Sequence, residues 1–304
     1  MSCLKSKNKP IFLILLAAYN GKNWLAEQLE SILGQRDVEV RLYISVDPSQ
    51  DGTELFVKRW AMDDQRVNVL ADAGRFGSAA RNFYRLVRDV EFSHFDYLSF
   101  SDQDDIWLPH KLSHAHRMIQ EGKYDAYSSN VISFWPDGKE RYINKSQPLR
   151  EYDFLFEAAG PGSTYIFNKK LAQSLQHFVK THYDQVNSVS LHDWLFYAFS
   201  RSHKYSWFID DNVGLLYRQH ETNHLGVNSG FSAYKDRLNF IATGWYHAEI
   251  TKIFKLCYSD HPFGESLIHR GWRARFFVMC HASQCRRRLS DRIILFLSCL
   301  LGLF

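Results

Sequence analysis

The sequence predicts an α/β fold built on a mostly parallel sheet flanked by helices, followed by a helical C-terminal extension. Over the first hundred residues, short apolar runs of strand length alternate with segments whose apolar residues recur at helical spacing. Strands that alternate with helices in this way form βαβ units, and such units build parallel sheets. The 304 residues, 45% hydrophobic and 23% charged, suffice for one large domain with a modest appendage.

The first strand is expected at Ile11–Ala18, a continuous apolar run typical of a strand that is covered on both faces. Three lysines precede it and imitate the start of a signal peptide. The run is short for that role, lacks a small-x-small cleavage site and leads into Tyr19-Asn20-Gly21, so we interpret it as a strand. The next helix follows from apolar residues at i, i+4, i+7 and i+8, which are Leu25, Leu29, Ile32 and Leu33.

The other elements of the first half continue this alternation. Strands are expected at Val38–Val46, Val67–Leu70 and Asp96–Ser101, and helices at Leu55–Trp60 and Ser78–Val90. After Pro109 the pattern is weaker. A turn at residues 134–138 predicts a hairpin that joins strands at Ala126–Ser133 and Glu140–Ile143. Helices are then expected at Lys169–Lys180, at Leu191–Ser200 and beyond Phe231.

The segment Ser101–Pro109 carries the strongest local signal for chemistry. Its three carboxylates, Asp102, Asp104 and Asp105, directly follow an apolar strand. Acids this close repel one another, so they form either a solvated turn or a site whose charge a cation neutralises. Carboxylate oxygens suit a hard divalent ion, Mg²⁺ or Mn²⁺, that keeps open positions for substrate phosphates. Since open parallel sheets bind ligands beyond the carboxyl ends of their strands, we favour the metal site.

Two further polar segments follow expected strands. Asp47 ends the second strand, where a carboxylate can accept hydrogen bonds from a base imide or a ribose hydroxyl. The adjoining Asp51-Gly52-Thr53 is by itself typical of a turn and a helix start. Small residues open the helix at Gly77–Asn82, and the helix N-terminus together with Arg81 would suit a diphosphate. Each of these signals is weak when it stands alone.

Together these segments resemble the family 2 glycosyltransferases, which have the GT-A fold, and in particular their bacterial rhamnosyltransferase-like branch. The resemblance extends over residues 10–226, with its motifs in the family's order. The motifs are Ala18-Tyr19-Asn20-Gly21, Asp47 with Asp51-Gly52-Thr53, Ala80-Arg81-Asn82, the run from Ser101 to Leu112, Gly162-Ser163-Thr164 with Phe167-Asn168-Lys169, His192-Asp193-Trp194, and Tyr217-Arg218-Gln219-His220 with Asn223.

The resemblance implies both a domain layout and a set of site residues. The GT-A domain would occupy residues 1–230, with a nucleotide-sugar half at 10–110 and an acceptor half at 111–230, and a helical extension would occupy 231–304. The implied nucleotide-sugar-binding residues are Ala18, Tyr19 against the base, Asn20, Asp47 as the base-recognising acid, Arg81 near the diphosphate, Asp102 and Gln103. The implied metal ligands are Asp104 and Asp102, as a DxD pair, and His220. Asp193 resembles the family's catalytic base.

Some of these residues also have simpler interpretations. Asp193 opens an apolar helical pattern and could serve only as a helix cap, whereas His192 fits an orienting or packing role better than that of the base. His220 also fits an ordinary loop histidine. One departure from the family bears on the donor. The family usually has two adjacent acids after the second strand, but here the first is Val46, and Pro48 replaces a common small residue.

The resemblance implies an inverting, metal-dependent glycosyltransferase that uses Mn²⁺ or Mg²⁺. It would move a sugar, with rhamnose as the candidate, from a dTDP- or UDP-sugar to a polysaccharide or lipid-linked glycan, as in lipopolysaccharide synthesis. Two alternatives remain at this stage, a nucleotidyltransferase that makes sugar nucleotides and a non-catalytic glycan-assembly module. The net charge of +4 is too small to indicate nucleic-acid binding.

The C-terminal segment gives a separate signal. Arg286-Arg287-Arg288 and Arg292 precede the apolar run Ile293–Phe304, which is too short to span a bilayer. This pattern predicts an interfacial helix whose basic residues meet lipid headgroups on the cytoplasmic face of the membrane. A helix packed on the enzyme or on a second copy is the alternative. The five cysteines form no CxxC pair and fit reduced cytosolic thiols, with Cys280-His281 and Cys285 as a weak zinc alternative.

Overall fold

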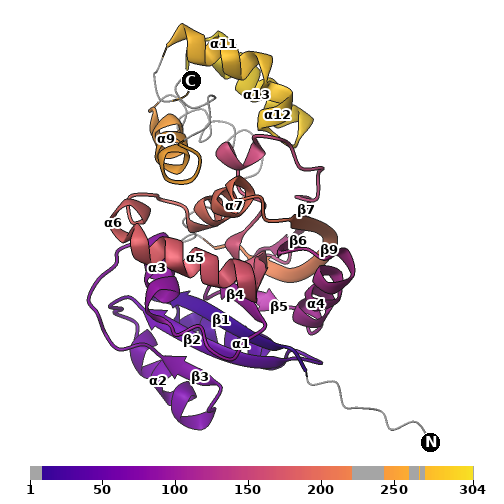
Figure 1. Ribbon diagram of the computed structural model, residues 1–304. Coiled ribbons are helices and arrows are strands. Elements are labelled where there is room, and N and C mark those ends of the chain that lie inside the picture. Colours follow the sequence, from indigo (N-terminus) through magenta and orange to yellow (C-terminus); the bar gives the residue numbers. More distant parts are fainter. Residues whose placement is uncertain (1–8, 221–242, 260–266, 268–270, 304) are drawn as a thin grey trace, which may run out of the picture.

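The computed structural model describes residues 9–220, 243–259, 267 and 271–303, and its centre is a single twisted sheet (Figure 1). The strand order is β3-β2-β1-β4-β8-β6-β9-β5, with β7 paired to β6. Helices cover both faces of this sheet. The predicted α/β fold with a mostly parallel sheet and a helical C-terminal region is therefore confirmed. Asn223 and the expected boundary at residue 230 lie outside the described residues.

The first half of the chain forms the parallel part of the sheet. Its elements are β1 (Ile11–Ala18), α1 (Lys22–Leu33), β2 (Glu39–Val46), α2 (Thr53–Asp63), β3 (Val67–Val69), α3 (Ala79–Asp89) and β4 (Tyr97–Ser101). Alternate residues of β1 enter two separate hydrophobic clusters, since Phe12 and Ile14 pack with α1 whereas Leu13 and Leu15 pack with α3. Packing on both faces explains why β1 has no polar residue.

The second half adds antiparallel strands and further helices. Its elements are β5 (Ile106–Trp107), α4 (Lys111–Gly122), β6 (Ala126–Phe134), β7 (Glu140–Ile143), η1 (Asp153–Leu155), η2 (Gly162–Thr164), β8 (Ile166–Asn168), α5 (Lys169–Thr181), α6 (Tyr183–Val186), α7 (His192–Ser202) and β9 (Trp207–Arg218). The predicted hairpin forms between β6 and β7. The long strand β9 was not predicted. Its middle holds Asp210, Asp211 and Asn212 where the pairing with β6 shifts register, and these residues hide the alternation that would mark a strand.

The C-terminal helices are α9 (Trp245–Cys257), α11 (Trp272–Cys280), α12 (Ala282–Cys285) and α13 (Leu289–Leu300). They lie at the end of the molecule beyond α7, with α11 beside α13 (Figure 1). Phe254, Val278 and Leu295 belong to the same hydrophobic cluster as Phe196 of α7. The extension and the sheet domain therefore share one core.

The contacts of the arginines just before and within α13 differ from the sequence prediction. Arg286 donates to the Phe156 carbonyl at 2.5 Å, and Arg287 donates to the Ala158 carbonyl at 2.6 Å. Arg287 also lies 3.5 Å from the buried Asp153 carboxylate, and Arg292 donates to the Arg286 carbonyl at 2.8 Å. The prediction that these three side chains meet lipid headgroups was wrong, because Arg286 and Arg287 fasten the extension to the segment around η1 and Arg292 binds the carbonyls of those two arginines. Arg288 alone of the predicted set is exposed.

Candidate active site

The polar residues predicted from the sequence gather at the carboxyl edge of the parallel strands. Tyr19 follows β1 and Gln103 follows β4, and the two residues form a reciprocal pair. The Tyr19 N–H donates to Gln103 Oε1 at 2.7 Å, and Gln103 Nε2 donates to the Tyr19 carbonyl at 2.9 Å. A Cβ at Gly21 would lie 2.2 Å from Gln103 Oε1, so only glycine leaves room for this pair. Residues 102–105, here called the acid loop, are thereby held against the end of β1.

The acid loop holds buried carboxylates whose pKa values are raised. Burial, followed by the charges of Asp104 and Asp193, raises the pKa of Asp102 to about 7. Burial and the same acid loop also raise the pKa of the fully buried Asp105 well above its ordinary value. Carboxylates with raised pKa values favour either a proton or a bound cation. The loop therefore has the electrostatics of a site that takes a positive charge.

Asp104 and His220, which are 116 residues apart in the sequence, meet at this loop. His220 Nε2 lies 2.8 Å from Asp104 Oδ2. The imidazole stacks on the Trp24 indole with ring centroids 4.1 Å apart and an interplanar angle of 8°. Packing on α1 therefore fixes the orientation of the ring toward the acid. The structure brings these two predicted metal ligands together, which an ordinary loop histidine would not require.

The donor set fits a divalent ion that is shared with a substrate. Within the described ranges, no three His, Cys, Asp or Glu side chains gather closely enough to hold a metal by themselves. Mg²⁺ and Mn²⁺ are commonly held by one or two carboxylates together with substrate phosphates. Asp102, Asp104 and the imidazole of His220 offer ligand types that such an ion accepts. These side chains could therefore supply the protein's share of the ligands, and the substrate phosphates would supply the rest.

Asp193 stands in the first turn of α7, after the N-cap Leu191. Its Oδ1 accepts the Trp194 backbone N–H at 2.8 Å, and no other described residue donates to its Oδ2. Burial raises the pKa of Asp193 to about 6, against the lowering effect of the Trp194 N–H and of Lys145. Asp193 is therefore not the N-cap residue of α7, and its Oδ2 accepts no hydrogen bond from the described residues.

His192 packs rather than titrates. Its ring stacks on Phe83 with centroids 4.1 Å apart, and burial lowers its pKa to about 3. A Cβ at Gly162 would lie 2.5 Å from His192 Nε2 and 3.4 Å from the Asp193 Cβ. The glycine of η2 therefore permits the close approach that orders the start of α7. His192 is a packing residue, in line with the sequence interpretation.

The predicted nucleoside-binding residues hold the loops of this edge together. The Asp47 carboxylate, only 4% exposed, accepts the backbone N–H groups of Phe76 and Gly77 at 3.1 and 2.8 Å. Asn20 accepts the Gln50 N–H at 2.8 Å, and its own N–H donates to Ser49 Oγ. Ala18 is buried, whereas Tyr19 is exposed at the rim. Tyr19 is therefore the residue of this group whose side chain is open to a ligand.

Arg81 lies at the predicted helix start, but its guanidinium contacts a backbone carbonyl instead of facing the expected diphosphate site. Ser78 caps α3 by accepting the Arg81 N–H at 3.3 Å. The Arg81 Nε donates to the carbonyl of Asn187, just after α6, at 3.2 Å. In this structure the side chain therefore binds backbone of the acceptor half, and the expected diphosphate contact requires it to turn.

The sequence analysis assigned no role to two residues of the site, Arg218 and Lys145. Arg218 donates to the Asp104 carbonyl at 2.8 Å and forms an ion pair with Glu27, so it joins the acid loop to α1. The charge of Lys145 acts to lower the pKa of Asp193, against the larger effect of burial. The only signal for Arg218 was its place in the motif before His220. Nothing in the local sequence marked Lys145.

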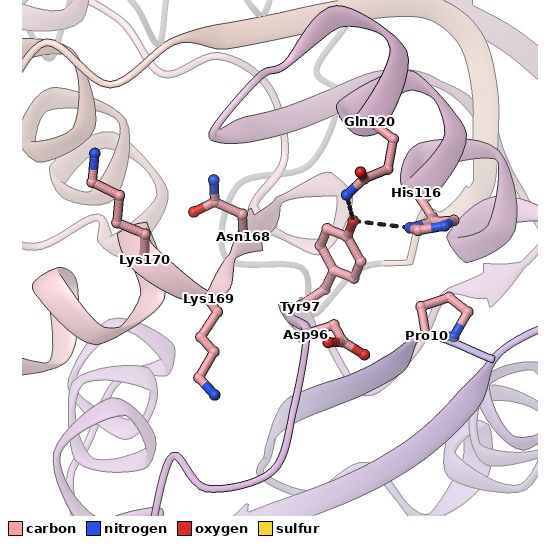
Figure 2. Close-up of a pocket in the computed structure, with 8 residues that line it drawn as sticks. All are labelled: Pro10, Asp96, Tyr97, His116, Gln120, Asn168, Lys169 and Lys170. Atoms are coloured by element: carbon pink, nitrogen blue, oxygen red, sulfur yellow. Dashed lines mark hydrogen bonds between the residues drawn. The ribbon is translucent and has the colours of Figure 1, made fainter. Parts of the chain in front are cut away.

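A hollow of about 460 Å³ lies at the opposite edge of the sheet, beside the first residues of β1 and β4 (Figure 2). The Tyr97 hydroxyl receives a hydrogen bond from Gln120 at 2.7 Å and lies 2.9 Å from His116 Nδ1. Lys169 and Lys170 line its other side. None of the residues predicted to bind the nucleotide sugar, the metal or the acceptor proton lines this hollow, although Asn168 and Lys169 of the family motif do.

Comparison with known proteins identifies the family of the chain. The family model of glycosyl transferase family 2 matches residues 13–184. The chain is 37% identical over 290 residues to a dTDP-rhamnosyl transferase, RfbG of Shigella flexneri, which covers 95% of this chain and 100% of the relative.

Solved structures give the same fold at low sequence identity. The structure of S. aureus TarS 1–349 in complex with UDP matches with a TM-score of 0.57 and 13% identity, over 96% of this chain and 91% of that one. The mannosyltransferase PcManGT from Pyrobaculum calidifontis, in complex with GDP-Man and Mn²⁺, matches with a TM-score of 0.53 and 14% identity, over 98% and 86% of the two chains. From the family match and the full-length relative, the chain belongs to glycosyl transferase family 2 and is a glycosyltransferase that uses a nucleotide-sugar donor.

Proposed function

We propose that the protein is an inverting, metal-dependent rhamnosyltransferase that moves rhamnose from dTDP-rhamnose to a polysaccharide or lipid-linked glycan. The donor is suggested by the dTDP-rhamnosyl transferase that is 37% identical along nearly the whole chain. The observation that carries the reaction type is the arrangement at the carboxyl edge, where the acid loop and Asp193 lie within electrostatic reach of each other. A lipid-linked acceptor would bring the reaction to a membrane surface.

Asp102, Asp104 and His220 would hold the ion together with the donor diphosphate. When bound, Mg²⁺ or Mn²⁺ would offset the negative charge that grows on the departing diphosphate. The His220 imidazole is oriented by Trp24, and Arg218 fixes the backbone of Asp104, so the protein's ligands are arranged before the donor binds. Tyr19 at the rim would contact the base, and Asp47 would act by holding the neighbouring loop in place.

In the proposed step, the acceptor hydroxyl attacks the anomeric carbon of the donor sugar. The new C–O bond forms as the bond from the anomeric carbon to the β-phosphate oxygen breaks, and dTDP leaves with the bond's electron pair. The acceptor proton passes to Oδ2 of Asp193, which acts as the general base. A single displacement with one base inverts the anomeric configuration. Lys145 beside Asp193 would steady the carboxylate form.

A donor panel tests the proposed function. With Mn²⁺ present, dTDP-rhamnose is expected to raise the melting temperature more than dTDP-glucose, UDP-glucose or UDP-GlcNAc, because ligands that bind the native state stabilise it. Transfer from dTDP-rhamnose should release dTDP. A preference for a UDP-sugar would refute the dTDP-rhamnose assignment while leaving glycosyl transfer intact. Release of pyrophosphate would indicate a nucleotidyltransferase.

The rate of transfer is expected to fall as the medium becomes more acidic, with half of the maximal kcat near pH 6. A general base works as the carboxylate, and the pKa of Asp193 is raised to about 6, so protonation below that pH removes the base. His192 does not titrate in this range, because burial lowers its pKa to about 3. The measurement is kcat against pH at saturating donor and Mn²⁺, which separates this loss from weaker metal binding. A kcat that stays constant well below pH 6 would contradict the role of Asp193.

A further inference from the structure

The outward side of the C-terminal helices is an apolar surface. Of the 13 large apolar side chains that are exposed among the described residues, nine belong to α11, α13 and the turn after it. They are Trp272, Phe276, Leu289, Ile293, Phe296, Leu297, Leu300, Leu301 and Leu303. The other four are scattered over the sheet domain and need no explanation. We call the nine residues the C-terminal apolar face, and a contiguous patch of this kind marks an interaction site.

Helical spacing explains why one side of each helix is apolar and outward. Trp272 and Phe276 are four residues apart on α11, and Leu289, Ile293, Leu297 and Leu300 recur at intervals of three or four on α13. The opposite sides are already buried. Val278 of α11 and Leu295 and Cys299 of α13 belong to the shared core, and Ala274 and Asp291 are buried as well. Folding of the chain therefore leaves this outer face uncovered among the described residues.

The charge around the face selects its partner. Arg288 is exposed at the start of α13, and Arg273 is exposed beside Trp272 on α11. Arg275 reaches the other end of α13, since its Nη1 lies 2.5 Å from where a Cβ at Gly302 would stand. Asp291 is the one acid of residues 271–303 and is only 8% exposed. Arginines thus border the face at both ends, and no exposed acid of this segment opposes them.

This border favours a membrane over a second copy of the chain. In a twofold dimer formed through the face, the same arginine-bordered patch would lie on both partners, and like charges would meet. Anionic lipid headgroups are complementary to arginine, and tryptophan favours the headgroup level of a bilayer. Among the described residues, no helix is long and apolar enough to cross a membrane. The face therefore suits binding at the interface, parallel to the surface.

We propose that the C-terminal apolar face docks the enzyme on an anionic phospholipid surface. Trp272, Phe276, Ile293 and Leu297 enter the boundary between headgroups and acyl chains, and Arg273 and Arg288 contact the headgroups. This deepens the proposed function, because a lipid-linked acceptor would be presented at that surface. The docking itself needs neither donor nor metal, so it can be measured without the reaction.

The test is co-sedimentation of the full chain with vesicles of phosphatidylglycerol and phosphatidylethanolamine, and with vesicles of phosphatidylcholine. The parent chain is expected to sediment with the anionic vesicles. The double variant Ile293→Glu/Leu297→Glu should bind about tenfold more weakly or worse, since buried apolar area drives interfacial binding. Arg273→Gln and Arg288→Gln should each weaken binding about fivefold, and only on anionic vesicles. The matched control is Leu55→Glu/Met62→Glu, which changes two exposed apolar residues of α2 and should bind like the parent.

Two outcomes would overturn the proposal. One is equal sedimentation of the parent and the Ile293→Glu/Leu297→Glu variant, with unchanged melting temperatures. The other is a parent chain that does not bind vesicles and forms a dimer in analytical ultracentrifugation, while the double variant is a monomer. That result would show that the face binds a second copy of the chain. Transfer to a water-soluble acceptor, measured without lipid, should be unchanged in the double variant. A parent chain that transfers sugar but does not bind anionic vesicles thus refutes the docking surface, whereas absent transfer in the parent refutes the proposed function.

Discussion

The Asp193→Asn variant is expected to bind the donor like the parent chain and to lose transfer by about 10²–10⁴-fold, the usual contribution of a positioned general base. The amide has the shape of the carboxylate, and its oxygen can still accept the Trp194 N–H that Asp193 Oδ1 accepts at 2.8 Å. The first turn of α7 and its packing on Gly162 are therefore preserved. What is lost is the ability to take the proton of the acceptor hydroxyl.

The measurements are kcat for transfer and the donor Kd by calorimetry with Mn²⁺. Because the substitution keeps the hydrogen bond from the Trp194 N–H, a purely structural role for Asp193 would leave kcat unchanged. Transfer by Asp193→Asn at the parental rate would require a different base. The pH profile provides a second check, since the residual activity of the variant should no longer fall around pH 6.

Asp104→Ala is expected to remove metal-dependent donor binding and to lower transfer by about 10³-fold or more, since several kcal/mol of charge stabilisation at the leaving group would be lost. The substitution deletes the carboxylate that lies 2.8 Å from His220 Nε2. It leaves the stacking of His220 on Trp24 intact, so the loop is not expected to unfold.

The assay is transfer as a function of Mn²⁺ concentration, with Asp72→Ala as the control because Asp72 is exposed in the loop before α3. The control should respond to Mn²⁺ like the parent. Excess Mn²⁺ should not restore Asp104→Ala. Undiminished transfer by the parent chain in a metal chelator, or by Asp104→Ala, would show that the acid loop does not work through a metal.

The parallel half of the fold could be predicted from the sequence because its signals are local. Ile11–Ala18 is covered on both faces and is therefore apolar at every position, and the end of each strand coincides with a polar segment. The acid loop was identified for the same reason. β9 could not be predicted, since its bulge and its polar middle depend on pairing with β6, which lies far away in the sequence.

Contacts between distant segments account for the remaining differences. His220 and Trp24 are far apart in the chain, and no local pattern shows that their rings stack. The arginines before α13 look like a lipid-binding run when only their neighbours are considered. Their partners are the carbonyls of Phe156 and Ala158 and the buried Asp153, about 130 residues earlier. A sequence pattern gives the charge of such a run but not whether it faces water or protein.

The contacts of Arg286 and Arg287 with the segment around η1 have a geometric consequence for catalysis at a bilayer. Tyr197 of α7 donates to the same Asp153 carboxylate at 2.9 Å, so Asp153 connects the C-terminal helices to the helix that carries Asp193. An active site joined to its membrane anchor by a flexible linker would vary in its distance from the bilayer. Here the Asp193 carboxylate would stay at one fixed distance from the lipid surface. That distance would determine how far an acceptor sugar must extend from the bilayer to reach it.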